Sequence, residues 1–269
     1  MIHIVTALPC EARPLIDHYR LQGRQREHGF RIYENGALHL IIAGVGKCAA
    51  AAACAYLQGR DAGAKHAWLN LGIAGHRHLA VGTAVLAHKV GDAASGQAWY
   101  PPLPFQVPCT TVDLVSVDQP EGDYGDGAAY DMEAAGFYAT AGRFNTHELV
   151  QVLKVISDNA AHPADQVTAT HAEQLITARL DTIDAMIRQL GQLEQRLGRQ
   201  HPEIGQLQPY LQRWHFSVSQ QHQLQRLLQR WQALAERLPE VDEFAGARSG
   251  KQVIAALQAR LATLPVRWP

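Results

Sequence analysis

The chain has no excess of charge of either sign. Its 24 Lys and Arg residues and 25 Asp and Glu residues leave a formal net charge of −1. No strong basic field is therefore expected to hold a nucleic acid or an anionic membrane. Cysteine is also scarce, with no close-spaced pair of the kind that binds metals among its four residues: Cys10, Cys48, Cys54 and Cys109. A reduced, cytoplasmic setting is the expectation.

Long hydrophobic runs are missing as well. The longest apolar stretches fall well short of the roughly 20 residues that span a membrane as a helix. The first residues, MIHIVTALP, have no basic segment before them, which favours a buried strand over a signal peptide. With 269 residues and 47% hydrophobic content, the chain can form one large domain, alone or with an appendage.

Strand and helix patterns alternate over residues 1 to about 190. Residues 150–158 (VQVLKVISD) form an apolar run typical of a buried strand, and residues 46–63 predict an alanine-rich helix that glycine ends. Residues 164–190 predict one long helical region. This alternation predicts an α/β fold, with helices packed on a central sheet that contains parallel strands.

The composition changes after about residue 190, where strand patterns stop and Gln, Arg and Leu dominate. Apolar residues recur there at three- and four-residue steps: Leu224, Leu227, Leu228, Trp231, Leu234 and Leu238. That spacing predicts an amphipathic helix with a packing face. Residues 196–269 therefore form a separate all-helical extension in this interpretation. The pattern leaves open whether the face packs on the sheet domain or on another chain.

Glycines and carboxylates gather at the ends of the predicted strands and helices. They stand in five short stretches: Glu11 in TALPCEA, Gly44 and Gly46 in AGVGK, Gly72 and Gly75 in LGIAG, Asp131 and Glu133 in YDMEAAG, and Asp158 in VISD. Taken singly, each fits a structural role, because acids complement the start of a helix and Asp favours turns. The carboxyl ends of strands are also where α/β proteins place their sites. Both interpretations of Asp158 remain open on this pattern alone.

Taken in order, these motifs resemble those of a known superfamily. TALPCEA, AGVGKCAAA, LNLGIAG with LAVGTAVLA, DMEAAGFYATA and LKVISDNA are similar to the nucleoside phosphorylase/nucleosidase superfamily, and closest to its methylthioadenosine/S-adenosylhomocysteine nucleosidase branch. The resemblance covers residues 1 to about 190. It implies a mixed, partly barrel-like sheet flanked by helices over residues 1–195, with residues 196–269 outside the family. It also implies a homodimer or higher homo-oligomer that acts on a small nucleoside.

The resemblance further implies a role for each acid. Glu133 would bind the ribose hydroxyls, and Met132 would lie against the sugar or the base. Asp158 would protonate the leaving purine, while Glu11 would activate the attacking water. Neighbouring positions in the motifs are expected to contact the substrate as well: Ile73, Gly75, Asp118 and Ser157, the last beside Asp158 and able to orient it.

Cleavage of an N-ribosidic bond explains why carboxylates are needed. Positive charge grows on the ribosyl ring in an oxocarbenium-like transition state, while negative charge grows on the base. A nearby carboxylate stabilises the first, and a partly buried acid that keeps its proton neutralises the second. A positioned acid or base contributes about 10²- to 10⁴-fold. This chemistry requires no metal and no cofactor.

Two positions favour hydrolysis over phosphorolysis. In the phosphorylase branch an arginine stands two residues before the first glycine of the LGIAG motif, and a serine or threonine follows that glycine; here the residues are Asn70 and Ile73. Glu11, in the first loop, would repel phosphate but could deprotonate water. Arg13 and Arg77 leave phosphorolysis open as an alternative, because phosphate sites use arginines.

Residues 90–111 depart from the nucleosidase branch, because this segment is rich in proline and too short for the insert that the family carries there. Trp99, Tyr100 and Phe105 would either line a reshaped pocket or anchor an irregular loop. Pro120 stands where an aromatic residue is expected. The 5′ substituent therefore stays open among thioethers, futalosine-type nucleosides, 5′-deoxyadenosine and lipid-linked adenosyl compounds. A non-catalytic ligand-binding or scaffold protein with a partner-binding tail is a further alternative.

Overall fold

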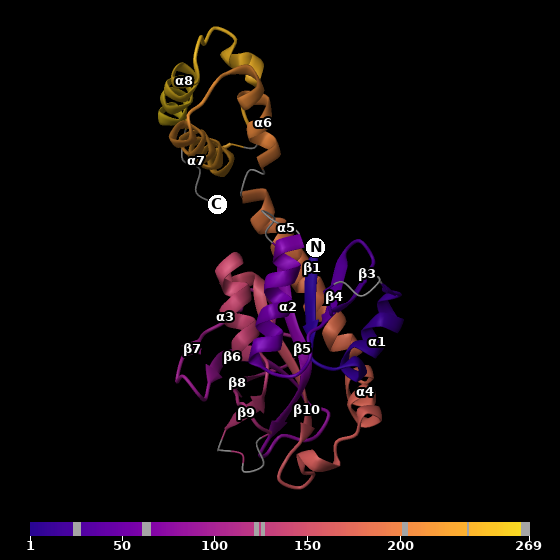
Figure 1. Ribbon diagram of the computed structural model, residues 1–269. Coiled ribbons are helices and arrows are strands. Elements are labelled where there is room, and N and C mark those ends of the chain that lie inside the picture. Colours follow the sequence, from indigo (N-terminus) through magenta and orange to yellow (C-terminus); the bar gives the residue numbers. More distant parts are fainter. Residues whose placement is uncertain are drawn as a thin grey trace. The chain divides into compact units, whose positions relative to one another are not determined.

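The computed structural model describes residues 1–23, 28–60, 66–120, 124, 127–200, 204–235 and 237–264. The chain divides into two compact units, Met1–Glu194 and Gln195–Pro269. The first unit contains all of the strands and helices α1–α4 with most of α5, and the second contains α6–α8 (Figure 1).

The strands of the first unit form one mixed sheet that closes on itself at one end. They are β1 (Ile2–Thr6), β2 (Gln22–Gly23), β3 (Arg31–Glu34), β4 (Leu38–Ile42), β5 (Ala67–His76), β6 (Ala84–Asp92), β7 (Ala98–Trp99), β8 (Thr110–Ser116), β9 (Ala128–Asp131) and β10 (Val150–Asp158). Nine of them follow the order β10-β6-β8-β9-β5-β1-β4-β3-β2, β7 pairs with β6 beside this path, and β10 also pairs with β5. Strands β10, β6, β8, β9 and β5 therefore make a closed ring, and β1, β4, β3 and β2 extend it. The predicted mixed, partly barrel-like sheet is confirmed.

Three parallel strands end at the same edge of this sheet. β5 pairs in parallel with both β1 and β10. Every residue of β1 and β10 is buried, which explains why their sequences are apolar runs without alternation. Because parallel strands have their carboxyl ends at one edge, residues that follow β1 and end β5 and β10 come together there.

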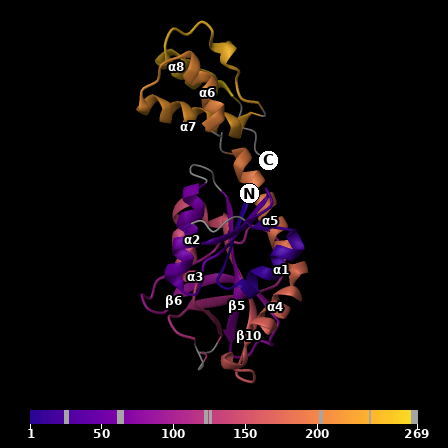
Figure 2. The same ribbon diagram turned by 45° about the vertical axis from the view of Figure 1, so that its right-hand side comes forward.

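Two pairs of helices cover the sheet. The helices of this unit are α1 (Pro9–Tyr19), α2 (Lys47–Arg60), α3 (Ala134–Phe144), α4 (Ala169–Thr177) and α5 (Leu180–Gln200), with short 3₁₀ turns η1 (His147–Leu149) and η2 (Ala164–Gln166). Helix α1 packs with α4, and α2 packs with α3. Figures 1 and 2 show these pairs on opposite sides of the strands. A Cβ at Gly136 would overlap the carbonyl oxygen of Lys47, so glycine allows α3 to approach the start of α2.

One predicted element differs in its boundaries. Residues 164–190 do not form one helical region but η2, α4 and the first part of α5. The chain leaves α4 at Ala178, and Arg179 Nε donates a hydrogen bond of 2.5 Å to the carbonyl oxygen of Gly82. Apolar spacing continues across this break, because both helices bury a face against the same unit, so the pattern alone did not reveal it.

The second unit is all helical and has its own core. It contains α6 (Ile204–Arg213), α7 (Val218–Leu234), the 3₁₀ turn η3 (Val241–Phe244) and α8 (Gly250–Thr263). Ser217 and Ser249 cap α7 and α8, each accepting a hydrogen bond from a backbone N–H three residues on. The predicted stripe is confirmed as far as Leu234, where α7 ends: Leu224, Leu228 and Trp231 are buried in a core shared with α6, η3 and α8. Leu238 lies beyond the helix and packs against the same core.

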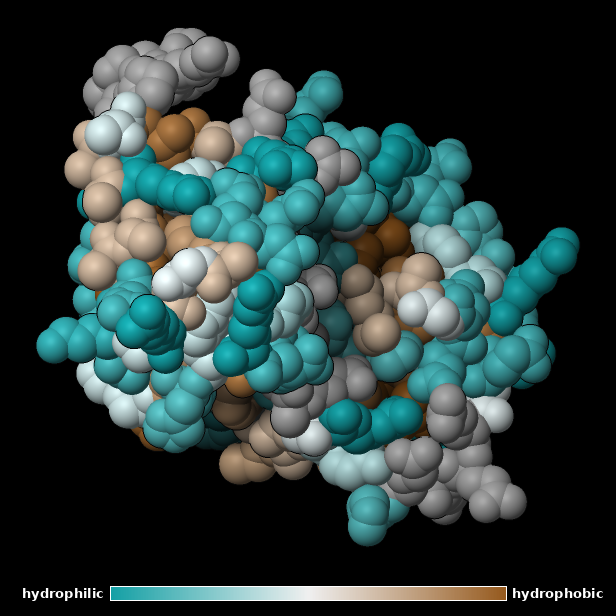
Figure 3. Space-filling view, turned by 90° about the horizontal axis from the view of Figure 1, so that it is seen from above, coloured by the Kyte–Doolittle hydropathy of each residue, from teal (hydrophilic) through white to brown (hydrophobic). Residues whose placement is uncertain are grey.

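The face of the molecule shown in Figure 3 is largely hydrophilic. Figure 3 shows polar side chains over most of the face that it presents, with hydrophobic ones gathered in smaller patches. Among the described residues, only four large hydrophobic side chains are exposed, and they are far apart in the sequence: Val45, Tyr100, Phe144 and Val218. No helix in the described ranges is long and apolar enough to cross a membrane.

Candidate active site

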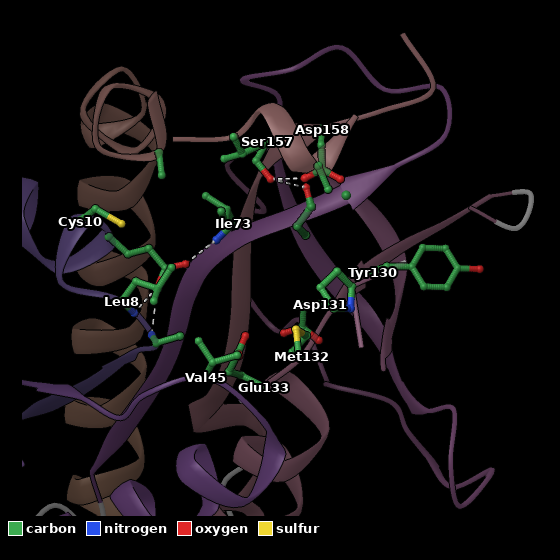
Figure 4. Close-up of a pocket in the computed structure, with 18 of the residues that line it drawn as sticks. Leu8, Cys10, Val45, Ile73, Tyr130, Asp131, Met132, Glu133, Ser157 and Asp158 are labelled. Atoms are coloured by element: carbon green, nitrogen blue, oxygen red, sulfur yellow. Dashed lines mark hydrogen bonds between the residues drawn. The ribbon is translucent and has the colours of Figure 1, made fainter. Parts of the chain in front are cut away.

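Acids from three distant parts of the chain line one cavity at the edge where β1, β5 and β10 end. The cavity has a volume of about 520 Å³, within the usual range for small-molecule sites. Seven of the eight residues predicted for the site line it: Glu11, Ile73, Gly75, Met132, Glu133, Ser157 and Asp158. Figure 4 shows the labelled pairs Ser157–Asp158 and Met132–Glu133 facing it from different sides.

Glu11 is held by three backbone N–H groups. It lies in the first turn of α1, where Oε2 accepts hydrogen bonds from the N–H groups of Ala7 (2.9 Å) and Leu8 (2.8 Å), and Oε1 accepts one from Ile73 (3.0 Å). The residue is only 3% exposed. Burial raises the pKa of Glu11, opposed by the charge of Lys154 and by these hydrogen bonds. A Cβ at Gly72 would lie 2.7 Å from Oε1, so the first glycine of LGIAG makes room for this carboxylate.

Glu133 lies between β9 and α3 and accepts a hydrogen bond from the backbone just before α2. Its Oε1 accepts a hydrogen bond of 2.8 Å from the N–H of Gly46, in the AGVGK stretch. Gly46 has φ of +102°, a backbone conformation that other residues rarely adopt. Burial raises the pKa of Glu133, while Lys154 opposes the shift and Asp131 adds to it.

A buried lysine provides a counter-charge for three of the acids. Lys154 on β10 is 2% exposed, and its Nζ lies 2.8 Å from Oδ2 of Asp131. Burial by itself lowers the pKa of Lys154, but the negative charges of Asp131, Glu133 and Glu11 together outweigh it and raise that pKa. Asp131 also accepts hydrogen bonds from Ser116 Oγ (2.5 Å) and the N–H of Ala134 (2.9 Å). Lys154 is thus the cation shared by three buried carboxylates.

Asp158 ends β10 with both carboxyl oxygens bonded to hydroxyl groups. Ser157 Oγ donates to Oδ1 and Tyr124 OH donates to Oδ2. Asp158 is 6% exposed. The register of β10 against β5 shifts between Ile156 and Asp158, and this bulge sets Asp158 opposite Gly75. A Cβ at Gly75 would overlap Oδ2 of Asp158, so the second glycine of LGIAG accommodates the second acid.

Asp118 is the predicted residue that the structure does not bring to the cavity. Its side chain is 64% exposed and pairs at 2.8 Å with Nζ of Lys47, which also binds Asp92 at 2.6 Å. Its neighbours Val117 and Pro120, which also follow the end of β8, line the cavity instead. The position of Asp118 in its motif predicts a contact with the substrate but does not reveal the direction of the side chain.

The other residues considered from the sequence lie elsewhere. Arg13 is exposed and pairs with Asp17 at 2.8 Å. Arg77 donates to the carbonyl oxygen of Tyr124 at 3.4 Å, and Asn70 Nδ2 donates to the carbonyl oxygen of Val5 at 3.1 Å. These side chains do not line the cavity; nor do the aromatic residues of the shortened segment: Trp99, Tyr100 and Phe105. Within the described residues, no group of His, Cys, Asp and Glu could hold a metal ion.

Sequence reasoning missed three residues of the site: Tyr124, Lys154 and the buried role of Asp131. A lysine inside the apolar run VQVLKVISD was a usable signal, because a buried lysine needs paired negative charge. Asp131, two residues before Glu133, fits the start of a helix by its sequence position, which does not reveal its ion pair with Lys154. Tyr124 carried no signal, because its segment has neither strand nor helix periodicity.

The ring of strands and the position of the cavity define the first unit as a nucleoside phosphorylase/nucleosidase fold. Within this fold, the chain is similar to the 5′-methylthioadenosine/S-adenosylhomocysteine nucleosidase of S. pneumoniae, solved with a transition-state inhibitor. The TM-score is 0.56 at 21% identity, over 70% of this chain and 99% of that chain. The resemblance inferred from the motifs is confirmed at the level of the fold.

Two further solved structures share this architecture. The 5′-methylthioadenosine nucleosidase of Arabidopsis thaliana matches with a TM-score of 0.57 at 17% identity, over 70% of this chain and 95% of that chain. The futalosine hydrolase of Helicobacter pylori matches with a TM-score of 0.55 at 16% identity, over 70% and 97%. No family model and no curated protein matches the sequence.

Proposed function

We propose that the protein hydrolyses the N-ribosidic bond of a purine nucleoside with a modified 5′ position. Asp158 acts as the general acid, Glu11 as the general base and Glu133 as the ligand of the ribose hydroxyls. The observation that carries this proposal is that these acids, distant in sequence, line one cavity of nucleoside size.

The reaction follows from the charges of this cavity. Asp158 gives its proton to N7 of the purine, and the electron pair of the N9–C1′ bond leaves with the base. The ribosyl ring becomes positive, and the carboxylates of Glu133 and Glu11 stabilise that charge. Water attacks C1′ and loses a proton to Glu11, whose raised pKa makes it a better proton acceptor than an ordinary glutamate.

The composition of the cavity wall favours hydrolysis over phosphorolysis. Among the described residues that line it, none is Arg, Lys or His, while four are acids: Glu11, Asp131, Glu133 and Asp158. A phosphate dianion here would have no cationic partner on the wall and would meet like charge, which is unfavourable. Water is neutral, so it needs no cationic partner and is not repelled by the acids.

One side of the cavity suits an apolar 5′ group. Leu8 and Cys10 contribute from the α1 side, and Val167, Ala169 and Ala172 from the segment that forms α4. Small and apolar side chains there would accept a thioether, and the similar solved structures include nucleosidases of 5′-methylthioadenosine. We therefore propose 5′-modified adenosine-type nucleosides as the substrate class.

Chromatographic detection of free base tests the proposal. Purified protein is incubated with 5′-methylthioadenosine, adenosine and futalosine, with and without phosphate. Free sugar released without phosphate is the expected result, and a phosphate-dependent sugar 1-phosphate would identify a phosphorylase instead. Asp158→Asn should lower the rate about 10²- to 10⁴-fold. Asp113→Asn is the control, because Asp113 pairs with Lys89 away from the cavity. Equal turnover by both variants would refute the role of Asp158.

We also propose that residues 1–195 carry this activity as a homodimer or larger homo-oligomer, and that residues 196–269 form a separate helical domain. The core that the second unit buries within itself supports the second point. Light scattering on the full chain measures the oligomeric state, and a monomer at all concentrations would contradict the first point.

A further inference from the structure

Tyr124 is a buried residue of the cavity that donates a hydrogen bond to the proposed general acid. It is 5% exposed, and its hydroxyl bonds Oδ2 of Asp158. It lies in the connection between β8 and β9, whose residues Val117 and Pro120 line the same cavity. The acid is thus contacted from its own strand by Ser157 and from a separate connection by Tyr124.

The surrounding backbone leaves room for this contact. A Cβ at Gly75 would overlap Oδ2 of Asp158 and would lie 2.5 Å from the ring of Tyr124. The ring centroid of Tyr130 lies 6.0 Å from that of Tyr124, at an angle of 44°. The tyrosine ring therefore packs closely against the backbone of β5 and near a second aromatic ring, and these contacts restrict its position.

Hydroxyl donors on both oxygens suit an acid that gives up a proton. Each carboxyl oxygen has two lone-pair positions, so one donor on each leaves a position for the proton that moves to the base. As the proton leaves, negative charge grows on the carboxyl, and hydrogen bonds to a charged group are stronger than those to a neutral one. An interaction that strengthens in the transition state raises kcat.

We propose that Tyr124 is a positioning residue for purine release: its hydroxyl fixes the carboxyl of Asp158 and stabilises the negative charge that the carboxyl acquires. The proton moves from Asp158 to N7, the N9–C1′ electron pair stays with the base, and Tyr124 keeps its own proton. This inference rests on the proposed function, because it requires Asp158 to be the acid.

Tyr124→Phe removes the hydroxyl and keeps the ring. With 5′-methylthioadenosine we expect kcat to fall about 10- to 100-fold, the effect of losing a hydrogen bond to a charged group. KM should change little, because the ring still forms the wall. With 4-nitrophenyl β-D-riboside, whose leaving group departs without a proton, the variant should retain the wild-type rate. A merely structural loss would lower both rates together.

A double-mutant cycle separates action through Asp158 from independent action. In the Asp158→Asn background, Tyr124→Phe should have no further effect on kcat. Tyr19→Phe is the matched control, because Tyr19 OH also bonds a carboxylate, that of Asp184, outside the cavity. That variant should keep full activity.

Three results would overturn the inference. Suppose that the wild-type protein cleaves 5′-methylthioadenosine. A Tyr124→Phe variant with the wild-type kcat, or with an equal loss of kcat on both substrates, would then refute the role of Tyr124 and leave the proposed function standing. Absence of base release by the wild-type protein from all the nucleosides tested would refute both.

Discussion

Replacing Lys154 by methionine removes the cation that three buried carboxylates share. Methionine has a similar length and no charge, so Asp131, Glu133 and Glu11 stay buried without a counter-charge. Removing one partner of a buried ion pair costs about 3–5 kcal/mol, because the other charge is left uncompensated. For a unit of 194 residues this corresponds to a decrease in Tm of roughly 6–20 °C. Scanning calorimetry measures this change in the transition of the first unit.

Lys89→Met is the matched control. Lys89 pairs with Asp113 at 2.9 Å, but both side chains are more than a third exposed. Exposed pairs contribute about 0–1 kcal/mol. The contrast between the two lysines therefore isolates the effect of burial from that of the ion pair itself.

The loss in Lys154→Met should also depend on pH. Without the lysine, the pKa values of Glu11 and Glu133, already raised by burial, should rise further. The folded variant then holds protons that the unfolded chain releases, so its stability falls as the pH rises. The deficit should be full above these raised values and should shrink as the pH falls toward the ordinary glutamate value of about 4.3. A Lys154→Met variant as stable as Lys89→Met at neutral pH would refute the reasoning.

Three further results are expected. Gly72→Ala and Gly75→Ala should each lower kcat/KM at least about 10²-fold, because the added Cβ displaces Glu11 or Asp158 and a misplacement of about 1 Å reduces the rate by that factor. Gly91→Ala is the control, because its Cβ would have no neighbour nearer than 3.8 Å, and it should keep the wild-type kcat/KM. As the pH is lowered, kcat/KM should decrease with a midpoint above about pH 4.3, the ordinary glutamate pKa, because the base must be ionised and burial raises the pKa of Glu11. A midpoint at or below that pH would contradict the role of Glu11 as the base. Deleting residues 196–269 should leave kcat and KM unchanged, and a loss of base release would contradict the proposed independence of the two domains.

The fold class, and the placing of Glu11, Glu133 and Asp158 near strand and helix ends, follow largely from patterns in the sequence. Apolar runs such as residues 150–158 predict buried parallel strands, because only fully buried strands lack alternation. Such strands end at a common edge, so acids that follow or end them have a reason to meet. The leucine spacing on residues 224–238 likewise predicted the packing face of a separate helical segment. These features depend on local periodicity, which the chain displays directly.

Only the tertiary structure decided how the acids are held. The close approach of Gly72 to Glu11 and of Gly75 to Asp158 depends on strand register and on a bulge, which local patterns do not encode. The hydroxyl of Tyr124 reaches Asp158 across 34 residues through a connection without periodicity. The exposed side chain of Asp118 pairs with Lys47, a residue 71 positions away in the sequence that no local pattern connects to it. Contacts between distant residues require the folded chain, and here they give each carboxylate its environment.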